Sequence, residues 1–155
     1  MFPKWFGTPW DFNGTSTVPK KGLIACGYFV TTVLQHSGFK IPRVKWAQMA
    51  SEGMIKKICK DIKRFHNAPI EQVAAYLNKK PDGLYIVGMD SHVGFLYRTG
   101  TKMRFVHSNY YQAQIGVMSE ELAGQNPLDD SGYLVIGRLF DDEMIRKWIE
   151  EKSWE

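Results

Sequence analysis

The order of the hydrophobic patterns constrains the fold most, because one helical pattern precedes a series of strand-like runs. Between Cys26 and about Ser37 the apolar residues recur at helical spacing, and Gly38 follows as a C-terminal stop. The later runs alternate or are continuously apolar, as in strands, and they read "LYIVGM", "VGFLYR", "KMRFVH" and "GYLVIGRLF". Residues 141–152 form a last helical pattern. A helix followed by a sheet predicts an α+β fold.

Two further segments complete the expected scaffold. Residues 45–65 and 69–79 both have helical patterns, which predicts a helical insert over about 45–79. Residues 1–22 are rich in Gly, Pro, Thr and aromatics, which predicts an irregular segment. It is expected to be held to the domain by its aromatic side chains, which are Trp5, Phe6, Trp10 and Phe12.

Length and composition predict a single catalytic domain. A chain of 155 residues with 44% apolar residues suits a single compact domain, 1–155. No apolar run approaches the roughly 18 to 20 residues of a membrane span. Met1–Trp10 lacks the features of a secretory signal. The compartment therefore stays open, and a cytoplasmic location follows only if this N-terminus is native.

Charge and cysteine content exclude some classes of protein. The formal charge of +4 predicts only mild attraction to anionic polymers. The densest basic stretch runs from Lys56 to Arg64 at helical spacing and is interpreted as a solvated helix face, and no nucleic-acid-binding motif accompanies it. Cys26 and Cys59 are the only cysteines, so we expect no disulfide framework and no zinc cluster.

Cys26 is the candidate nucleophile because it lies in the first turn of the predicted helix. A thiol ordinarily has a pKa of about 8.5, and a helix N-terminus or a neighbouring imidazolium lowers that pKa. Cys26 is placed to have both, although a free cysteine is also commonly a small buried apolar residue. Cys59 is predicted to lie in the middle of a helix and to be structural.

The candidate base comes from the predicted hairpin. A turn at Thr99 and Gly100 places His92 directly opposite His107, and such pairs have Cβ atoms about 4.5 to 5.5 Å apart. The same parity puts Asn109 on the face of His107. A thiolate at a helix start, a histidine base at a strand start and a third polar group satisfy the needs of nucleophilic catalysis. The alternative is that each histidine is a strand-end residue satisfied by the backbone.

Five blocks of the sequence resemble, in this order, the NlpC-type cell-wall cysteine peptidases. The blocks are "WDFNGTS", "ACGYFV", "SGFKIPRVKWAQ", "KPDGLYIVGMDSHVGFLY" and "FVHSNY". The resemblance implies a papain-like α+β fold and a Cys26, His92 and His107 site that hydrolyses amide bonds in peptidoglycan stem peptides through a thioester. It implies no cofactor and no metal, and it favours a secreted, periplasmic or cell-envelope location.

The chain also departs from the family pattern, mainly around the cysteine. Ala25, Gly27 and Tyr28 replace the usual aspartate, serine and glycine, and Trp10 stands where the family has a tyrosine. An indole N–H donates a hydrogen bond but cannot accept one, so Trp10 is a candidate substrate or oxyanion contact, or a plain core aromatic.

Two other polar residues complete the candidate site. Ser91 matches a small polar position of the family and either contacts substrate or is an ordinary loop serine. Asn109 is an alternative third polar group and a candidate substrate contact. The backbone N–H of Cys26 is the natural oxyanion donor, because a helix start has free N–H groups.

Three functions follow from these residues. The first is a peptidoglycan amidase or endopeptidase, which acts on the organism's own wall or, as a toxin with a dedicated inhibitor protein, on that of a competitor. The second is a papain-like acyltransferase or deamidase with another substrate, since fold alone does not choose the substrate. The third is a degenerate binding module without catalysis.

Overall fold

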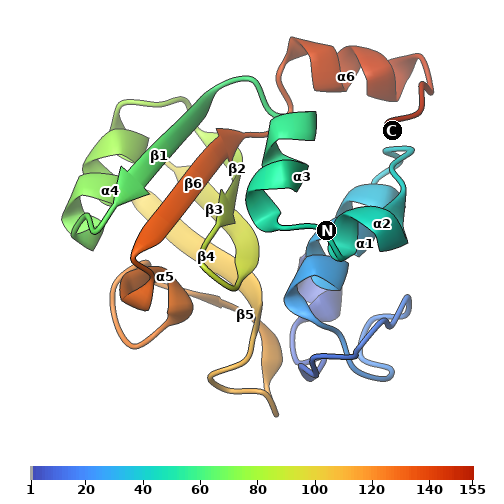
Figure 1. Cartoon of the computed structure of the whole chain (residues 1–155), viewed down its shortest axis with the longest axis horizontal. Coiled ribbons are helices and arrows are strands. Elements are labelled where there is room, and N and C mark those ends of the chain that lie inside the picture. Colours follow the sequence, from blue (N-terminus) through green and yellow to red (C-terminus); the bar gives the residue numbers. More distant parts are fainter. Residues whose placement is uncertain (1) are drawn as a thin grey trace.

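A six-stranded antiparallel sheet with helices on both faces forms the protein (Figure 1), so the predicted α+β class is confirmed. The computed structural model describes residues 2–155, and Met1 lies outside the described residues. The helices are η1 (Pro3–Trp5), α1 (Cys26–His36), α2 (Arg43–Ala47), α3 (Ser51–Ile58), α4 (Ile70–Asn78), α5 (Pro127–Asp130) and α6 (Asp142–Ile149). The strands are β1 (Ile62–His66), β2 (Gly83–Gly88), β3 (Val93–Thr99), β4 (Lys102–Asn109), β5 (Gly116–Glu120) and β6 (Tyr133–Arg138).

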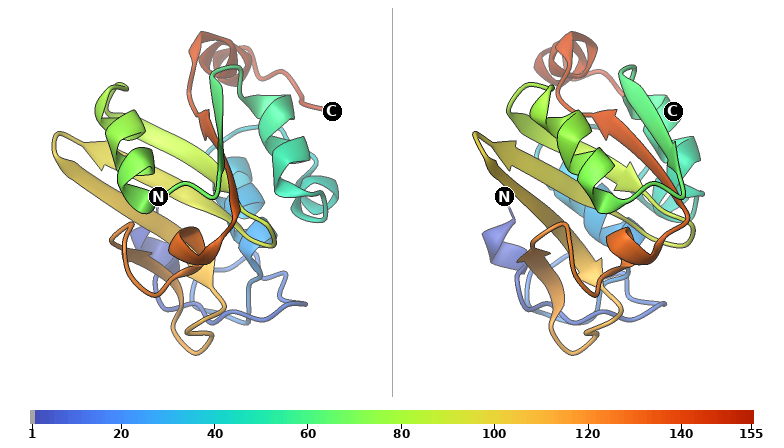
Figure 2. Two further views of the ribbon diagram at one scale, coloured as in Figure 1. Left: turned by 60° about the vertical axis from the view of Figure 1, so that its left-hand side comes forward. Right: turned by 90° about the vertical axis from the view of Figure 1, so that its left-hand side faces the viewer.

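The strand order β1-β6-β2-β3-β4-β5 places the C-terminal strand inside the sheet. Helices α1 and α3 cover one face, and α4 covers the other (Figure 2). Successive residues of β2 alternate between these layers, since Ile86 packs with α1 and Val87 packs with α4. The sheet is therefore buried on both faces.

Helix α1 begins at Cys26, as the sequence predicts. Ala25 is its N-cap in an extended conformation, and Gly38 has a φ of 103° just after the helix ends. Gly27 allows the close approach of α2, because a Cβ there would lie 2.4 Å from the carbonyl oxygen of Ala47. The absence of a side chain at position 27 thus sets how α1 packs against its neighbour.

The prediction of a wholly helical insert over 45–79 is wrong in its middle part. Residues 62–66 form β1, which pairs with β6 along the edge of the sheet. Ile62 packs in the layer of α1 and Phe65 in the layer of α4. A helix would bring residues three apart onto one side, whereas a strand separates them. Cys59 accordingly lies in extended backbone at the end of α3, not in the middle of a helix.

The predicted register of the β3–β4 hairpin is wrong by two residues. Thr99 pairs with Lys102, so the turn contains Gly100 and Thr101. Gly100 has a φ of 59°, and a two-residue hairpin turn favours glycine at a central position with positive φ. An even shift preserves which face each side chain occupies. His92 and His107 therefore stay on one face, although they are diagonal and not directly opposed.

The N-terminal segment is irregular and packed, as predicted, and it pairs with a strand that the sequence did not reveal. The N–H of Gly7 donates to the carbonyl of Val117 on β5, and the N–H of Val117 donates to the carbonyl of Thr8. Phe12 does not anchor this segment, because its side chain is 79% exposed. The segment covers the β5 edge and brings Trp10 towards α1.

Candidate active site

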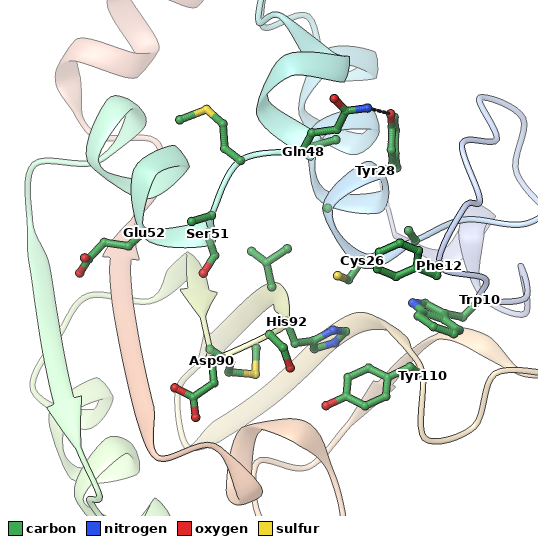
Figure 3. A pocket seen from close by; sticks show the side chains of 18 of the residues that line it. Trp10, Phe12, Cys26, Tyr28, Gln48, Ser51, Glu52, Asp90, His92 and Tyr110 are labelled. Carbon is green, nitrogen blue, oxygen red and sulfur yellow. Dashed lines mark hydrogen bonds between the residues drawn. The ribbon is translucent and has the colours of Figure 1, made fainter.

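A cavity of about 840 Å³ opens at the start of α1 and collects side chains from six parts of the chain (Figure 3). Its walls are the N-terminal segment, the first turn of α1, the segment from the end of α2 to the start of α3, the β2–β3 loop, the residue after β4 and the start of β6. Residues from these walls that matter below are Trp10, Phe12, Cys26, Tyr28, Gln48, Ser51, Glu52, Asp90, Ser91, His92, Tyr110 and Tyr133.

Cys26 is held against the sheet by a hydrogen bond just before α1. The hydroxyl of Ser108 on β4 donates to the carbonyl oxygen of Ile24 at 2.7 Å, and both residues are fully buried. The backbone before the helix is thereby fixed to the strand that carries His107. The side chain of Cys26 lines the cavity opposite His92 (Figure 3).

Burial raises the pKa of the Cys26 thiol, whereas the backbone N–H groups of Val93, Gly27 and Cys26 itself lower it. The net direction is upward, which is opposite to the lowered pKa expected from the helix start. Desolvation disfavours the charged form and outweighs the nearby N–H groups here. The resting form of Cys26 is therefore the thiol.

His92 lies just before β3 and is 4% exposed. Its Nε2 is 2.7 Å from Nδ1 of His107, and the two rings are nearly perpendicular at 83°. The ring of Tyr110 packs edge-on against His92 at a centroid distance of 5.0 Å. Nδ1 of His92 has no hydrogen-bond partner among the described residues. This nitrogen is the free end of the pair at the cavity that holds Cys26.

His107 is fully buried and lies between His92 and an acidic residue. Its Nε2 is 2.6 Å from Oε2 of Glu120 on β5, and its ring stacks on Phe105 with a centroid distance of 3.8 Å. Burial lowers the pKa of His107, while the hydrogen bond and charge of Glu120 raise it. Burial is the main cause that holds the pKa of His92 well below its usual value, and repulsion from a protonated His107 is the second cause. Both imidazoles are neutral at neutral pH.

Asn109 lies beside the hydrogen-bonded side chains of His107 and Glu120 and does not line the cavity. Its Nδ2 donates to Oε2 of Glu120 at 3.4 Å, and its Oδ1 accepts from the N–H of Tyr111 at 2.9 Å. The side chain is fully buried. The structure thus brings His107, and not Asn109, against His92, and Asn109 is not among the residues that line the cavity.

Trp10 and Ser91 both line the cavity. The indole of Trp10 points towards Cys26 (Figure 3), and its Nε1 is buried without a hydrogen-bond partner among the described residues. A buried donor without an acceptor is costly. Ser91 belongs to the short β2–β3 loop between Asp90 and His92. Trp10 is therefore a cavity residue and not a plain core aromatic.

Three contributors to the site escaped the sequence reasoning. Glu120 lies on β5, a five-residue strand whose only sequence signal is the short run after Gly116. Tyr110 directly follows β4 and closes one side of His92. Gln48 donates from Nε2 to the hydroxyl of Tyr28 at 3.2 Å across the cavity wall. Each needs a tertiary neighbour to acquire its role, so periodicity alone does not single it out.

The charge of the cavity differs from that of the whole chain. Glu52 and Asp90 lie on the side away from Trp10 (Figure 3), and the described lining residues include no lysine or arginine. Arg64 and the hydroxyl of Tyr133 engage one oxygen of Glu52, while the N–H of Gly132 donates to Oδ2 of Asp90 at 3.0 Å. The cavity therefore has an aromatic end and an acidic end, with Cys26 and His92 between them.

Residues 2–155 hold no group of three or more His, Cys, Asp or Glu side chains arranged for a metal ion. Among the helices of this part of the chain, none is long and apolar enough to cross a membrane. Both cysteines are free thiols. The chain matches none of the protein-family models, curated proteins or solved structures with which it was compared. Function must therefore be inferred from the geometry of the cavity.

Proposed function

We propose that this protein is a cysteine hydrolase with a papain-like arrangement, which cleaves amide bonds in peptidoglycan stem peptides through a thioester. The observation that carries the proposal is Nδ1 of His92, which has no hydrogen-bond partner among the described residues, in a ring that lines the same cavity as Cys26 and whose Nε2 is held by His107 at 2.7 Å. This is the orientation that a general base beside a thiol requires. The resemblance of the five sequence blocks supports the choice of substrate.

The reaction begins with transfer of the Cys26 thiol proton to Nδ1 of His92, and the sulfur attacks the scissile carbonyl carbon. The backbone N–H of Cys26, in the first turn of α1, donates to the developing oxyanion, and the unpartnered Nε1 of Trp10 supplies a second donor. The tetrahedral intermediate collapses as Nδ1–H of His92 protonates the leaving amine. The acyl group is then bound to Cys26 as a thioester.

Deacylation reverses the proton movements with water as the nucleophile. Nδ1 of His92 removes a proton from water, and the hydroxide attacks the thioester carbonyl. The carbon–sulfur bond breaks, the carboxylic acid leaves, and the proton returns to the sulfur. An enzyme acting on the cell wall works outside the cytoplasm, either on its own wall or as a toxin that a dedicated inhibitor protein restrains in the producing cell.

The test is digestion of purified peptidoglycan, with the products identified by mass spectrometry. Wild-type protein should release stem-peptide fragments, and Cys26→Ala should lower the rate by at least about 10³-fold because no nucleophile remains. Cys59→Ala is the matched control, since Cys59 is buried away from the cavity and should leave the rate nearly unchanged. Equal digestion by wild type and Cys26→Ala would refute the proposed nucleophile.

The raised pKa of Cys26 also suits a second function, a binding module that has lost catalysis. Such a module has no use for a base beside the thiol. Incubation with purified peptidoglycan separates the two functions, because only the hydrolase converts its substrate. Binding of the protein to a wall that stays intact would favour the binding module.

A further inference from the structure

A pair of neutral histidines can form the same hydrogen bond in two directions. Either Nε2–H of His92 donates to Nδ1 of His107, or Nδ1–H of His107 donates to Nε2 of His92. Only the first leaves a lone pair on Nδ1 of His92, because a neutral imidazole carries one proton. The 2.7 Å distance between Nε2 of His92 and Nδ1 of His107 fits both directions. A third group must therefore determine which nitrogen donates.

Glu120 is that group. A carboxylate only accepts hydrogen bonds, so its Oε2, 2.6 Å from Nε2 of His107, requires the proton of His107 to be on Nε2. Nδ1 of His107 is then an acceptor and His92 donates from Nε2. Nδ1 of His92 therefore carries no proton and keeps its lone pair. Asn109 donates to the same Oε2 at 3.4 Å and Met118 lies beside Asn109, which keeps the carboxylate on this side of the sheet.

We propose that Glu120 is the positioning residue that sets the tautomers of both histidines and so makes Nδ1 of His92 the base. The proposal deepens the proposed function and rests on it for its catalytic meaning. Glu120 acts indirectly, through its hydrogen bond to His107, and it is not one of the residues that line the cavity with Cys26. A hydrogen bond to a charged acceptor biases the tautomer ratio by roughly 10- to 100-fold, which is enough to keep the base available in nearly every molecule.

The hydrogen-bonded row of His92, His107 and Glu120 also receives the charge that forms during the reaction. When the Cys26 proton moves to Nδ1 of His92, the ring becomes an imidazolium that still donates from Nε2 to His107. His107 in turn still donates to Glu120, so no hydrogen bond has to be broken or reversed. The carboxylate of Glu120, which reaches His92 through the fully buried His107, adds a compensating charge for this imidazolium on the side away from the Cys26 sulfur. The opposite tautomers would require both rings to exchange protons before attack.

The experiment reads the tautomers directly by long-range ¹H–¹⁵N NMR of the histidine rings of the whole protein at neutral pH. The wild type should carry hydrogen on Nε2 of both His92 and His107. Glu120→Leu, which removes the acceptor at similar size, should shift the tautomer ratio of both rings towards Nδ1–H by at least tenfold. Glu120→Gln keeps an accepting oxygen and should retain the wild-type tautomers. Glu121→Gln, one residue along and exposed, is the matched control and should change nothing.

Hydrogen on Nδ1 of either ring in the wild type overturns the proposal, and so do unchanged tautomers in a folded Glu120→Leu variant. The wild-type spectrum alone decides the matter if Glu120→Leu does not fold. The readout does not depend on peptidoglycan: an intact wall together with the assigned tautomers rejects the proposed function but leaves the role of Glu120 standing.

Discussion

At the scale of single residues, burial decides the protonation of the site. His92 and His107 are 4% and 0% exposed, and burial lowers the pKa of both. It also raises the pKa of Cys26. Each shift favours the uncharged form, so the resting site holds a thiol and two imidazoles, not an ion pair. In the proposed reaction, proton transfer then belongs to the step of attack.

The first prediction concerns the pH dependence of Cys26 alkylation. Because the thiolate is the reacting form, alkylation by iodoacetamide should rise roughly tenfold per pH unit below the pKa of the thiol. Burial raises the pKa of Cys26 above that of an ordinary thiol, so the rate should still be climbing well above neutral pH. Peptide mapping by mass spectrometry measures it, with Cys59 as internal comparison, since burial and the nearby carboxylates of Asp141 and Asp61 raise its pKa to about 12. A plateau of Cys26 labelling near neutral pH would contradict the neutral resting pair.

A second prediction concerns stability in acid. A histidine whose folded pKa lies below its unfolded value of about 6.5 binds more protons when unfolded, so stability falls as the pH drops through 6.5 towards the folded pKa. His92 and His107 each contribute up to about 1.4 kcal/mol per pH unit in that window. Urea unfolding between pH 7 and pH 5 measures this loss. A wild-type free energy of unfolding that is flat across this window would show that neither ring is buried neutral.

At the scale of elements, sequence periodicity could predict α1 and the shared face of the two histidines. The start of the helix at Cys26 followed from apolar spacing and from Gly38. The pairing of His92 with His107 survived a register error because a shift of two residues keeps the face. The exact partner across the hairpin could not be predicted, since it depends on which turn position Gly100 occupies.

Periodicity failed for β1 and β5, which bound the sheet. Ile62 and Phe65 suit a helix as well as a strand in the sequence, and only pairing with β6 separates them onto two faces. β5 has one fully buried apolar side chain, Val117, and gains its place from β4 and from the N-terminal segment. Glu120 could not be assigned to the site because its strand was not recognised.

The third prediction tests how closely α1 and α2 pack. Gly27→Ala should destabilise the protein by about 1 to 3 kcal/mol, because the new Cβ would lie 2.4 Å from the carbonyl oxygen of Ala47 and force the helices apart. Gly53→Ala on α3 is the matched control, since its Cβ would meet only the flexible end of Met49 at 3.1 Å. It should gain up to about 1 kcal/mol from helix propensity. Urea unfolding distinguishes them, and equal stabilisation by both changes would contradict the close packing.

At the scale of the whole molecule, the charge is unevenly distributed. The chain carries a formal +4, yet the described lining of the cavity contains Glu52 and Asp90 and no lysine or arginine. One oxygen of Asp90 accepts a backbone N–H, which leaves the other available to a bound group. Because Arg64 pairs with Glu52, Asp90 is the carboxylate that we expect to attract an ammonium group to this cavity.

The fourth prediction follows from this distribution. Asp90→Asn should lower kcat/KM for a stem peptide with a free amino group by about 2- to 5-fold, the effect of one partly exposed ion pair. The same peptide with its amino group acetylated should be cleaved equally by both proteins. Glu71→Gln, an exposed change on α4, should leave both rates unaltered. An equal loss on the two peptides would show that Asp90 supports the loop and does not bind the ammonium group.

The position of β6 inside the sheet has a consequence for when the cavity forms during synthesis. β6 pairs with both β1 and β2, and Tyr133 at its start lines the cavity. A nascent chain that has not released residues 133–138 leaves β1 without a neighbour and one cavity wall missing. Contacts between segments so distant in sequence form slowly, after local helices such as α1. We therefore expect the cavity to be completed late, after α1 with Cys26 at its start has formed.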